Sequence, residues 1–169
     1  MTIIEIVAQC AGVLGIAVFL LCFHSNNMKN VLKVKFLTDI IWGTHYFLLG
    51  AYSGFATNAV CCVRELIFMN NNKKAFRSVI WLYVFIAFNI ITAILTWQSF
   101  YSLIPAVVSS MATISFWQKD VGYARKIAIT NNVLMFTYDI FVASYTGMIC
   151  ETLAFISVLM SMIRNRTRK

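Results

Sequence analysis

Charged residues are scarce in this sequence of 169 residues: they make up 12% of it, whereas hydrophobic residues make up 60%. A soluble domain of this size could not cover so much apolar surface, so the composition excludes one. Acidic residues are scarcer still, with six Asp and Glu against 14 Lys and Arg, which gives a net charge of +8. We expect no nucleic-acid partner, because the distribution of the basic residues along the chain already accounts for that charge.

The sequence also lacks the patterns of common catalytic and metal sites. It contains no Ser-His-Asp grouping, no His-Glu-x-x-His motif and no Gly-rich phosphate loop. Its only two histidines, His24 and His45, lie about one membrane span apart, which is too far for a shared metal site. The five cysteines have no metal-ligand spacing and fit small apolar packing positions. We therefore expect no enzyme activity, no metal and no cofactor.

Apolar runs separated by short polar gaps fill most of the chain. Each run is close to the roughly 20 residues that cross the core of a bilayer. Because the runs lack the alternation of barrel strands, they predict transmembrane helices and an all-α integral membrane protein. We place seven spans at Ile3–Phe23, Val34–Gly50, Gly54–Met69, Val79–Trp97, Tyr101–Trp117, Ile127–Ala143 and Met148–Ile163.

All basic residues except Arg64 fall in four clusters, which occupy every second gap between the apolar runs. The clusters are Lys29, Lys33 and Lys35; Lys73, Lys74 and Arg77; Lys119, Arg125 and Lys126; and Arg164, Arg166, Arg168 and Lys169. Cytoplasmic loops of membrane proteins carry an excess of Lys and Arg. The pattern therefore predicts an N-terminus outside and a C-terminus inside.

The two halves of the chain resemble each other at an offset of 93 residues, without a gap. The offset superimposes Phe23 on Phe116, Lys33 on Lys126, Thr44 on Thr137, Tyr52 on Tyr145, Gly54 on Gly147 and Leu66 on Leu159. We interpret this as two parallel three-helix bundles, residues 1–72 and 100–169, with the basic tail in the second. A linker helix in residues 73–99 would join them in a 3+1+3 plan. Parallel repeats of this kind are known in transporters, with the site at the repeat interface.

An inner polar layer near the cytoplasmic side consists of Asp39 on the second span with Arg64 and Glu65 on the third. Asp39 and Arg64 lie at depths that allow a salt bridge between the two helices, which would be structural or would act in gating. At the offset of 93 they become Asn132 and Ser157, so both charges disappear together. Lys35 with Asp39 is a local alternative, because residues four apart on a helix are neighbours.

A second polar layer lies nearer the outer side. Its members, His45, Asn58, Asp139 and Glu151, each fall about four or five residues from the outer end of a predicted span. At 1.5 Å per residue they share a depth of roughly 6–8 Å. One interpretation is a polar cavity that binds a solute or ion, with His45, Asp139 and Glu151 as candidates for proton coupling. The other is hydrogen bonding between helices alone.

Trp42 and Asn58, sixteen residues apart on the second and third spans, resemble the sugar-facing Trp and Asn of the SWEET and SemiSWEET transporters. Those families place a Tyr three residues after the Trp, where this sequence has His45. In the second half the places of Trp, Asn and Tyr hold Met135, Glu151 and Tyr138. The resemblance implies a 3+1+3 transporter with a solute site made by these side chains. Asp139 joins the predicted site from the outer polar layer.

A likeness over nearly the whole length is to the YgjV-type bacterial inner-membrane proteins. It is carried by Asp39-x-x-Trp42-x-x-His45-Tyr46-x-x-x-Gly50 with Gly54, Asn58 and Arg64, and by Phe116-Trp117-Gln118-Lys119-Asp120, Arg125, Tyr138-Asp139 and Ser144-Tyr145-x-Gly147. This resemblance implies a multi-pass protein of the bacterial inner membrane but supplies no activity.

The sequence therefore favours a transporter or facilitator of a small solute, in which two bundles rock against each other and expose the site alternately. Its expected partners are the lipid bilayer and an unidentified solute, with protons as a second candidate; a homo-oligomer is also compatible with the sequence. The alternative is a membrane protein that transports nothing, such as a partner subunit, assembly factor or receptor. That alternative predicts bundles packed face to face with no continuous polar cavity.

Overall fold

The protein is all-helical over the residues that its computed structural model describes, which are 3–21, 27–70, 73, 76, 78–118 and 120–166. This confirms the all-α part of the predicted fold class. Within these residues there are seven α-helices and a short 3-10 helix, η3, and no strand. The elements are α1 (Ile3–Leu20), α2 (Met28–Leu48), α3 (Tyr52–Met69), α4 (Ile80–Leu95), η3 (Phe100–Ser102), α5 (Leu103–Trp117), α6 (Val121–Phe141) and α7 (Tyr145–Arg166). His24, Lys74, Arg77, Lys119, Arg168 and Lys169 lie outside the described residues.

Two helices begin six residues earlier than the apolar runs predict. α2 begins at Met28 and α6 at Val121, so their first two turns include basic residues that the prediction assigned to loops. Each start is fixed by a capping side chain: Asn27 Oδ1 accepts from the Lys29 amide at 2.9 Å and Asp120 Oδ1 from the Gly122 amide at 2.8 Å. Such caps satisfy backbone donors that the first turn leaves unpaired. Hydropathy marks where a helix becomes apolar and not where it starts.

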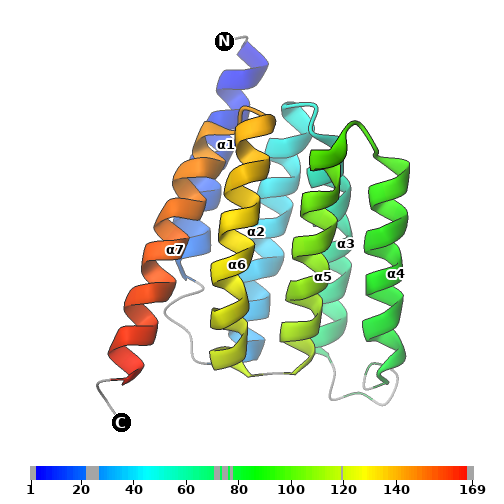
Figure 1. The fold of residues 1–169 in the computed structure, drawn as a ribbon, viewed down its shortest axis with the longest axis vertical. Helices are drawn as coiled ribbons and strands as arrows, with labels where there is room; N and C mark the ends of the chain where they lie inside the picture. Colours follow the sequence, from blue (N-terminus) through cyan, green and yellow to red (C-terminus); the bar gives the residue numbers. More distant parts are fainter. Residues whose placement is uncertain are drawn as a thin grey trace.

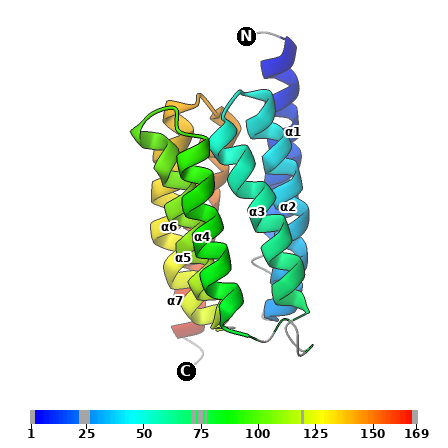
Figure 2. The same ribbon diagram turned by 90° about the vertical axis from the view of Figure 1, so that its right-hand side faces the viewer.

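Six helices close into a ring, and the seventh lies outside it. Neighbouring pairs are α1 with α2, α2 with α3, α3 with α5, α5 with α6, α6 with α7, and α7 with α1. α4 packs against α3 and α5 on the outside of this ring. Successive helices run in opposite directions along one common axis (Figures 1 and 2).

The two ends of the ring differ in composition. One end, which we call the basic end, is where α2 and α6 begin (Figure 1). The first two turns of these helices carry Lys29, Lys33 and Lys126. The opposite end, the turn end, joins α2 to α3 and α6 to α7 in a few residues. Both of these turns contain a residue with positive φ, Gly50 at 71° and Ala143 at 53°. Gly50 adopts that conformation without the steric cost that a side chain adds.

The outward surface of the helices is apolar. Large hydrophobic side chains are exposed on all seven described α-helices, among them Val13, Leu37, Val63, Ile90, Val107, Val133 and Ile149. By length and composition one segment, Phe100–Trp117, is long and apolar enough to cross a membrane; Ile3–Phe19, Ile80–Leu95 and Tyr145–Met160 are apolar but shorter. An apolar surface of this extent is unusual for a protein that water surrounds.

Candidate functional site

The ring of six helices encloses a cavity of about 210 Å³. All six contribute to its lining, from Tyr46 and Cys150 nearer the turn end to Met28 and Val121, the first residues of α2 and α6, at the basic end. Its polar and charged lining residues are Lys35, Asp39, Thr57, Asn58, Arg64, Ser109, Arg125, Asn131, Asn132 and Glu151. The remaining lining is mostly aliphatic and aromatic. The cavity therefore combines apolar walls with a few fixed polar groups, as small-molecule sites do.

Four of the seven predicted solute-contacting residues line this cavity together. Trp42 and Asn58 come from the first half of the chain, and Met135 and Glu151 come from the second half. Trp42 is held in place by an edge-on contact with His45 (ring centroids 5.1 Å apart) and by Gly15. A Cβ atom at Gly15 would lie 3.0 Å from the indole, so the absence of a side chain at this glycine lets α1 pack closely against Trp42.

The side chain of Glu151 on α7 is held by a hydrogen bond from the Asn132 side chain on α6. With its nitrogen turned toward acceptors, the Asn132 side chain donates to Glu151 Oε2 at 3.0 Å and to the Ala128 carbonyl at 3.1 Å. The Asn132 oxygen then accepts from the Phe155 amide at 3.1 Å. On the other side of the ring, Asn58 Nδ2 donates to the Gly54 carbonyl of its own helix at 2.8 Å. The carboxylate oxygens of Glu151 and the amide oxygen of Asn58 can therefore still accept hydrogen bonds from a ligand.

The other three predicted residues, His45, Tyr138 and Asp139, do not line the cavity but lie above it, toward the turn end. They belong to a buried hydrogen-bonded layer that we call the seal, formed by His45, Tyr46, Ser53, Tyr138, Asp139 and Ser144. His45 Nε2 lies 2.7 Å from Ser144 Oγ, and His45 Nδ1 lies 2.7 Å from the Ala8 carbonyl. These bonds tie α2 to α1 and to the α6–α7 turn, and so close the cavity on that side.

The seal bonds form matched pairs across the ring. The Tyr138 hydroxyl contacts Ser53 Oγ at 2.9 Å and accepts from the Gly54 amide at 3.0 Å. His45, which is 93 positions earlier, reaches the equivalent Gly147 amide through the Ser144 hydroxyl, which accepts from that amide at 3.2 Å. The shorter imidazole needs the serine as a bridge, whereas the tyrosine reaches its glycine directly.

The predicted ion pair between Asp39 and Arg64 is not formed. Asp39 Oδ1 instead accepts from Lys35 Nζ at 2.7 Å, one turn earlier on α2. Arg64 Nη2 donates to Glu65 Oε1 at 2.6 Å, and Arg64 Nη1 reaches α5 at the Ser109 carbonyl (3.0 Å) and Thr113 Oγ1 (2.9 Å). Lys35 lies one turn from Asp39 on the same helix, where side chains four residues apart are neighbours, so similar depth did not produce a contact between Asp39 and Arg64.

Sequence reasoning missed several polar residues that build the site. Ser144 and Ser53 in the seal and Ser109 and Thr113 against Arg64 are small hydroxyl residues, which also occur in ordinary helix packing and gave no separate signal. The adjacent Asn131 and Asn132 inside a predicted span were a usable signal, since amides are costly in lipid. Within the described parts of the chain, no group of three or more His, Cys, Asp and Glu side chains is placed to hold a metal.

Comparison with known proteins gives a family match over almost the whole chain. The model of the family Imp-YgjV, described as a bacterial inner membrane protein, matches residues 6–169. No curated protein and no solved structure matches the chain.

Proposed function

Because the chain belongs to the Imp-YgjV family of bacterial inner membrane proteins, we propose that it transports or facilitates the passage of a small solute between α1–α3 and α5–α7. The observation that carries this proposal is a cavity that is lined from both halves of the chain, has the seal above it and reaches the basic end. At about 210 Å³ the cavity lies below the range of roughly 300–1,000 Å³ that is usual for ligand pockets. The solute is therefore small. The alternative of a non-transporting protein predicts a dry contact between the halves, and the polar lining weighs against it.

The proposed topology has seven spans, with the turn end outside and the basic end in the cytoplasm. It is supported by exposed apolar side chains on every described α-helix, which lipid would cover. α2, α3 and α6 are less apolar than α1 and α4. Polar residues on them, such as Asp39, Arg64 and Asn132, face the cavity and would not face the lipid. The N-terminus would lie outside, and the basic residues would follow the cytoplasmic preference of Lys and Arg.

The proposed mechanism treats α1–α3 and α5–α7 as two parallel bundles joined by α4. Support comes from paired features that lie 93 residues apart: the bounds of α2 and α6, the caps Asn27 and Asp120, and the positive φ of Gly50 and Ala143. With the seal formed, the cavity would be open to the cytoplasm. Rocking of one bundle against the other would break the seal and bring the basic-end halves together, which exposes the site outside.

Protons are a candidate second substrate, and among the three proposed carriers we favour Glu151. It lines the cavity and has one amide partner, whereas His45 and Asp139 are enclosed in the seal. If Glu151 carries the proton, Glu151→Gln removes the dependence of uptake on a pH gradient while the variant still folds. A gradient response that is the same in Glu151→Gln and in the parent protein would exclude this role.

The transport proposal is tested by uptake of a broad panel of small solutes into proteoliposomes. Ala112 lines the cavity, so Ala112→Phe should fill it and abolish uptake. Ala87 is exposed on α4, outside the ring, and Ala87→Phe is the matched control that should retain uptake. Transport is excluded if the parent protein takes up no solute of the panel, or if both substitutions reduce uptake equally.

A further inference from the structure

Glu151 is the one carboxylate among the described cavity-lining residues that has no basic partner. The other lining carboxylate, Asp39, is paired with Lys35 at 2.7 Å. Glu151 Oε2 accepts one hydrogen bond from Asn132, and within the described residues its Oε1 has no hydrogen-bond or ion-pair partner. A largely buried carboxylate without a counter-ion is costly, so in the working protein such a group either takes up a proton or meets a cation.

The basic side chains of the lining are already committed or distant. Lys35 is neutralised by Asp39, and Arg64 by Glu65 at 2.6 Å together with oxygens of α5. Arg125 lies one turn from the basic end of α6, whereas Glu151 lies in the second turn of α7 from the opposite end. Helix rise puts these two side chains on the order of 15 Å apart along the ring axis, which is too far for an ion pair.

The walls around this carboxylate suit a cation that carries apolar groups. Trp42, Tyr46 and Met135 line the same cavity, and aromatic faces attract ammonium groups. One such contact between an ammonium group and an aromatic ring already exists in the lining, because Lys35 Nζ lies 5.5 Å from the centre of the Phe19 ring. Among the buried polar atoms of the lining that lack a hydrogen-bond partner, acceptors outnumber donors. The acceptors are Asp39 Oδ2 and Asn131 Oδ1, and the donor is Arg64 Nε.

We propose that the cavity binds a small organic cation, whose ammonium group lies against Glu151 and whose apolar groups lie against Trp42, Tyr46 and Met135. This inference rests on the proposed function and gives the chemical class of its solute. Asn58, whose amide nitrogen is committed to the Gly54 carbonyl, offers its oxygen to a hydroxyl or N–H donor of the same ligand. The cavity volume of about 210 Å³ limits the ligand to a molecule smaller than most drug-sized compounds.

The test is calorimetric binding to the purified full chain in detergent, with cations compared to neutral molecules of the same shape. Choline is compared with 3,3-dimethylbutan-1-ol, and butylamine with butan-1-ol. We expect at least one cation to bind tenfold or more tightly than its neutral counterpart. Equal binding within both pairs, or tighter binding of isobutyrate than of either cation, overturns the proposal.

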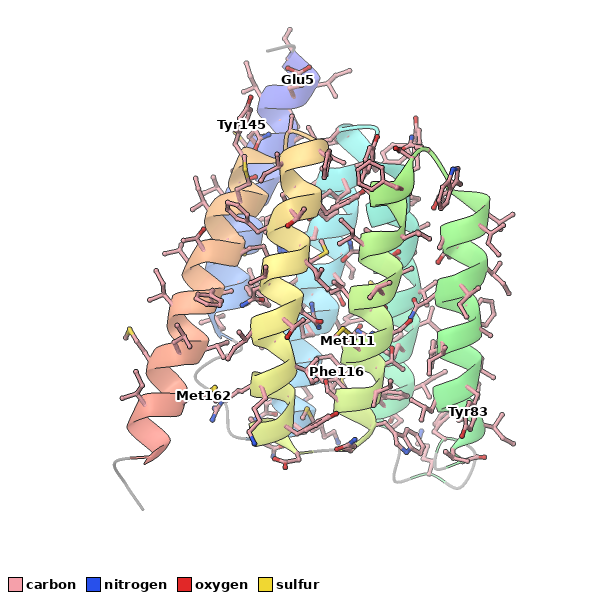
Figure 3. All side chains as sticks on the ribbon, viewed as in Figure 1. Glu5, Tyr83, Met111, Phe116, Tyr145 and Met162 are labelled. Carbon is pink, nitrogen blue, oxygen red and sulfur yellow. The ribbon has the colours of Figure 1, made fainter. Side chains whose placement is uncertain are left out.

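Variants locate the site. Glu151→Gln should reduce cation binding to the level of the neutral molecule, Glu151→Asp should retain part of the preference, and Trp42→Leu should weaken cation binding about tenfold. Glu5→Gln is the control, because Glu5 lies at the N-terminal end of α1, away from the cavity (Figure 3). A cation preference that survives Glu151→Gln places the cation elsewhere and overturns the assignment; thermal unfolding of each variant checks that it is folded.

Failure of this inference is distinguishable from failure of the transport proposal. Cation binding without uptake into proteoliposomes leaves the site in place and removes transport. Uptake of neutral solutes with no preference for cations leaves transport in place and removes the cation site.

Discussion

The Tyr46 hydroxyl donates a hydrogen bond to Asp139 Oδ1 at 2.8 Å, and the two residues are 93 positions apart in the chain. They occupy equivalent places on α2 and α6, so this bond joins a residue to its own counterpart in the other half. Each also packs on the equivalent glycine of the next helix, Tyr46 on Gly54 and Asp139 on Gly147. A contact between equivalent positions lies where the two halves meet, and it has to break if the halves separate at the turn end.

Removing the hydroxyl of Tyr46 should therefore open the seal. In Tyr46→Phe the buried Asp139 carboxylate loses its Tyr46 donor, while its Oδ2 already lacks a partner. We expect a several-fold faster reaction of a cysteine placed in the cavity, Ala112→Cys in a cysteine-free background, with a membrane-impermeant maleimide added from the outside. Tyr52→Phe is the control, since Tyr52 is exposed at the start of α3. Unchanged labelling in Tyr46→Phe would show that this bond does not hold the seal closed.

Removing the hydroxyl of Ser144 from the seal should destabilise the protein. It contacts His45 Nε2 at 2.7 Å and accepts from the Gly147 amide at 3.2 Å, so Ser144→Ala leaves two buried polar groups without that partner. Leaving buried groups unpaired costs about 1–3 kcal/mol, and we expect a lower midpoint of thermal unfolding in detergent. Ser157→Ala is the matched control, because Ser157 is half-buried and makes no side-chain hydrogen bond with the described residues. Equal midpoints for the two variants would contradict this.

The sequence predicted the helices and the depth of the polar residues, but not the direction in which their side chains point. Apolar runs and helix rise placed His45, Asn58, Asp139 and Glu151 in one layer, and all four do lie in the ring interior or directly above it. Their division between cavity and seal depends on rotation of each helix, which is set by close approaches such as that of Gly12 to Thr146. Such packing follows from the shapes of many side chains and has no local signature.

The predicted pairing of Asp39 with Arg64 was wrong for a related reason, whereas the local alternative, Lys35 with Asp39, is confirmed. Depth alone brought Asp39 and Arg64 together in the prediction, although each had a nearer partner in its own helix, Lys35 and Glu65. The starts of α2 and α6 were missed because they depend on the single capping residues Asn27 and Asp120 and not on hydropathy.

Gly12 should tolerate no side chain, whereas Gly43 should accept one. A Cβ atom at Gly12 would overlap the Thr146 side chain and approach His45 Nδ1 at 3.2 Å, so Gly12→Ala pushes α1 away from the seal. Overpacking of this kind costs about 1–3 kcal/mol and exceeds the gain of about 1 kcal/mol from replacing a helical glycine. At Gly43 the nearest atom would be Asn58 Cβ at 3.4 Å, an ordinary contact. Thermal unfolding should therefore show Gly12→Ala below, and Gly43→Ala at or above, the parent protein; the reverse order would contradict the packing of α1.

Removing Arg64 alone should destabilise the protein more than removing the charges of Arg64 and Glu65 together. Both side chains are buried, and Arg64 also joins α3 to α5 through Ser109 and Thr113. Arg64→Met leaves Glu65 as a buried carboxylate without its cation, which costs about 3–5 kcal/mol. Adding Glu65→Gln removes that stranded charge, so we expect the double variant to unfold at a higher temperature than Arg64→Met. A double variant that loses the sum of the two single effects would mean that Glu65 is neutralised by another group, and that Arg64 acts only through its hydrogen bonds to α5.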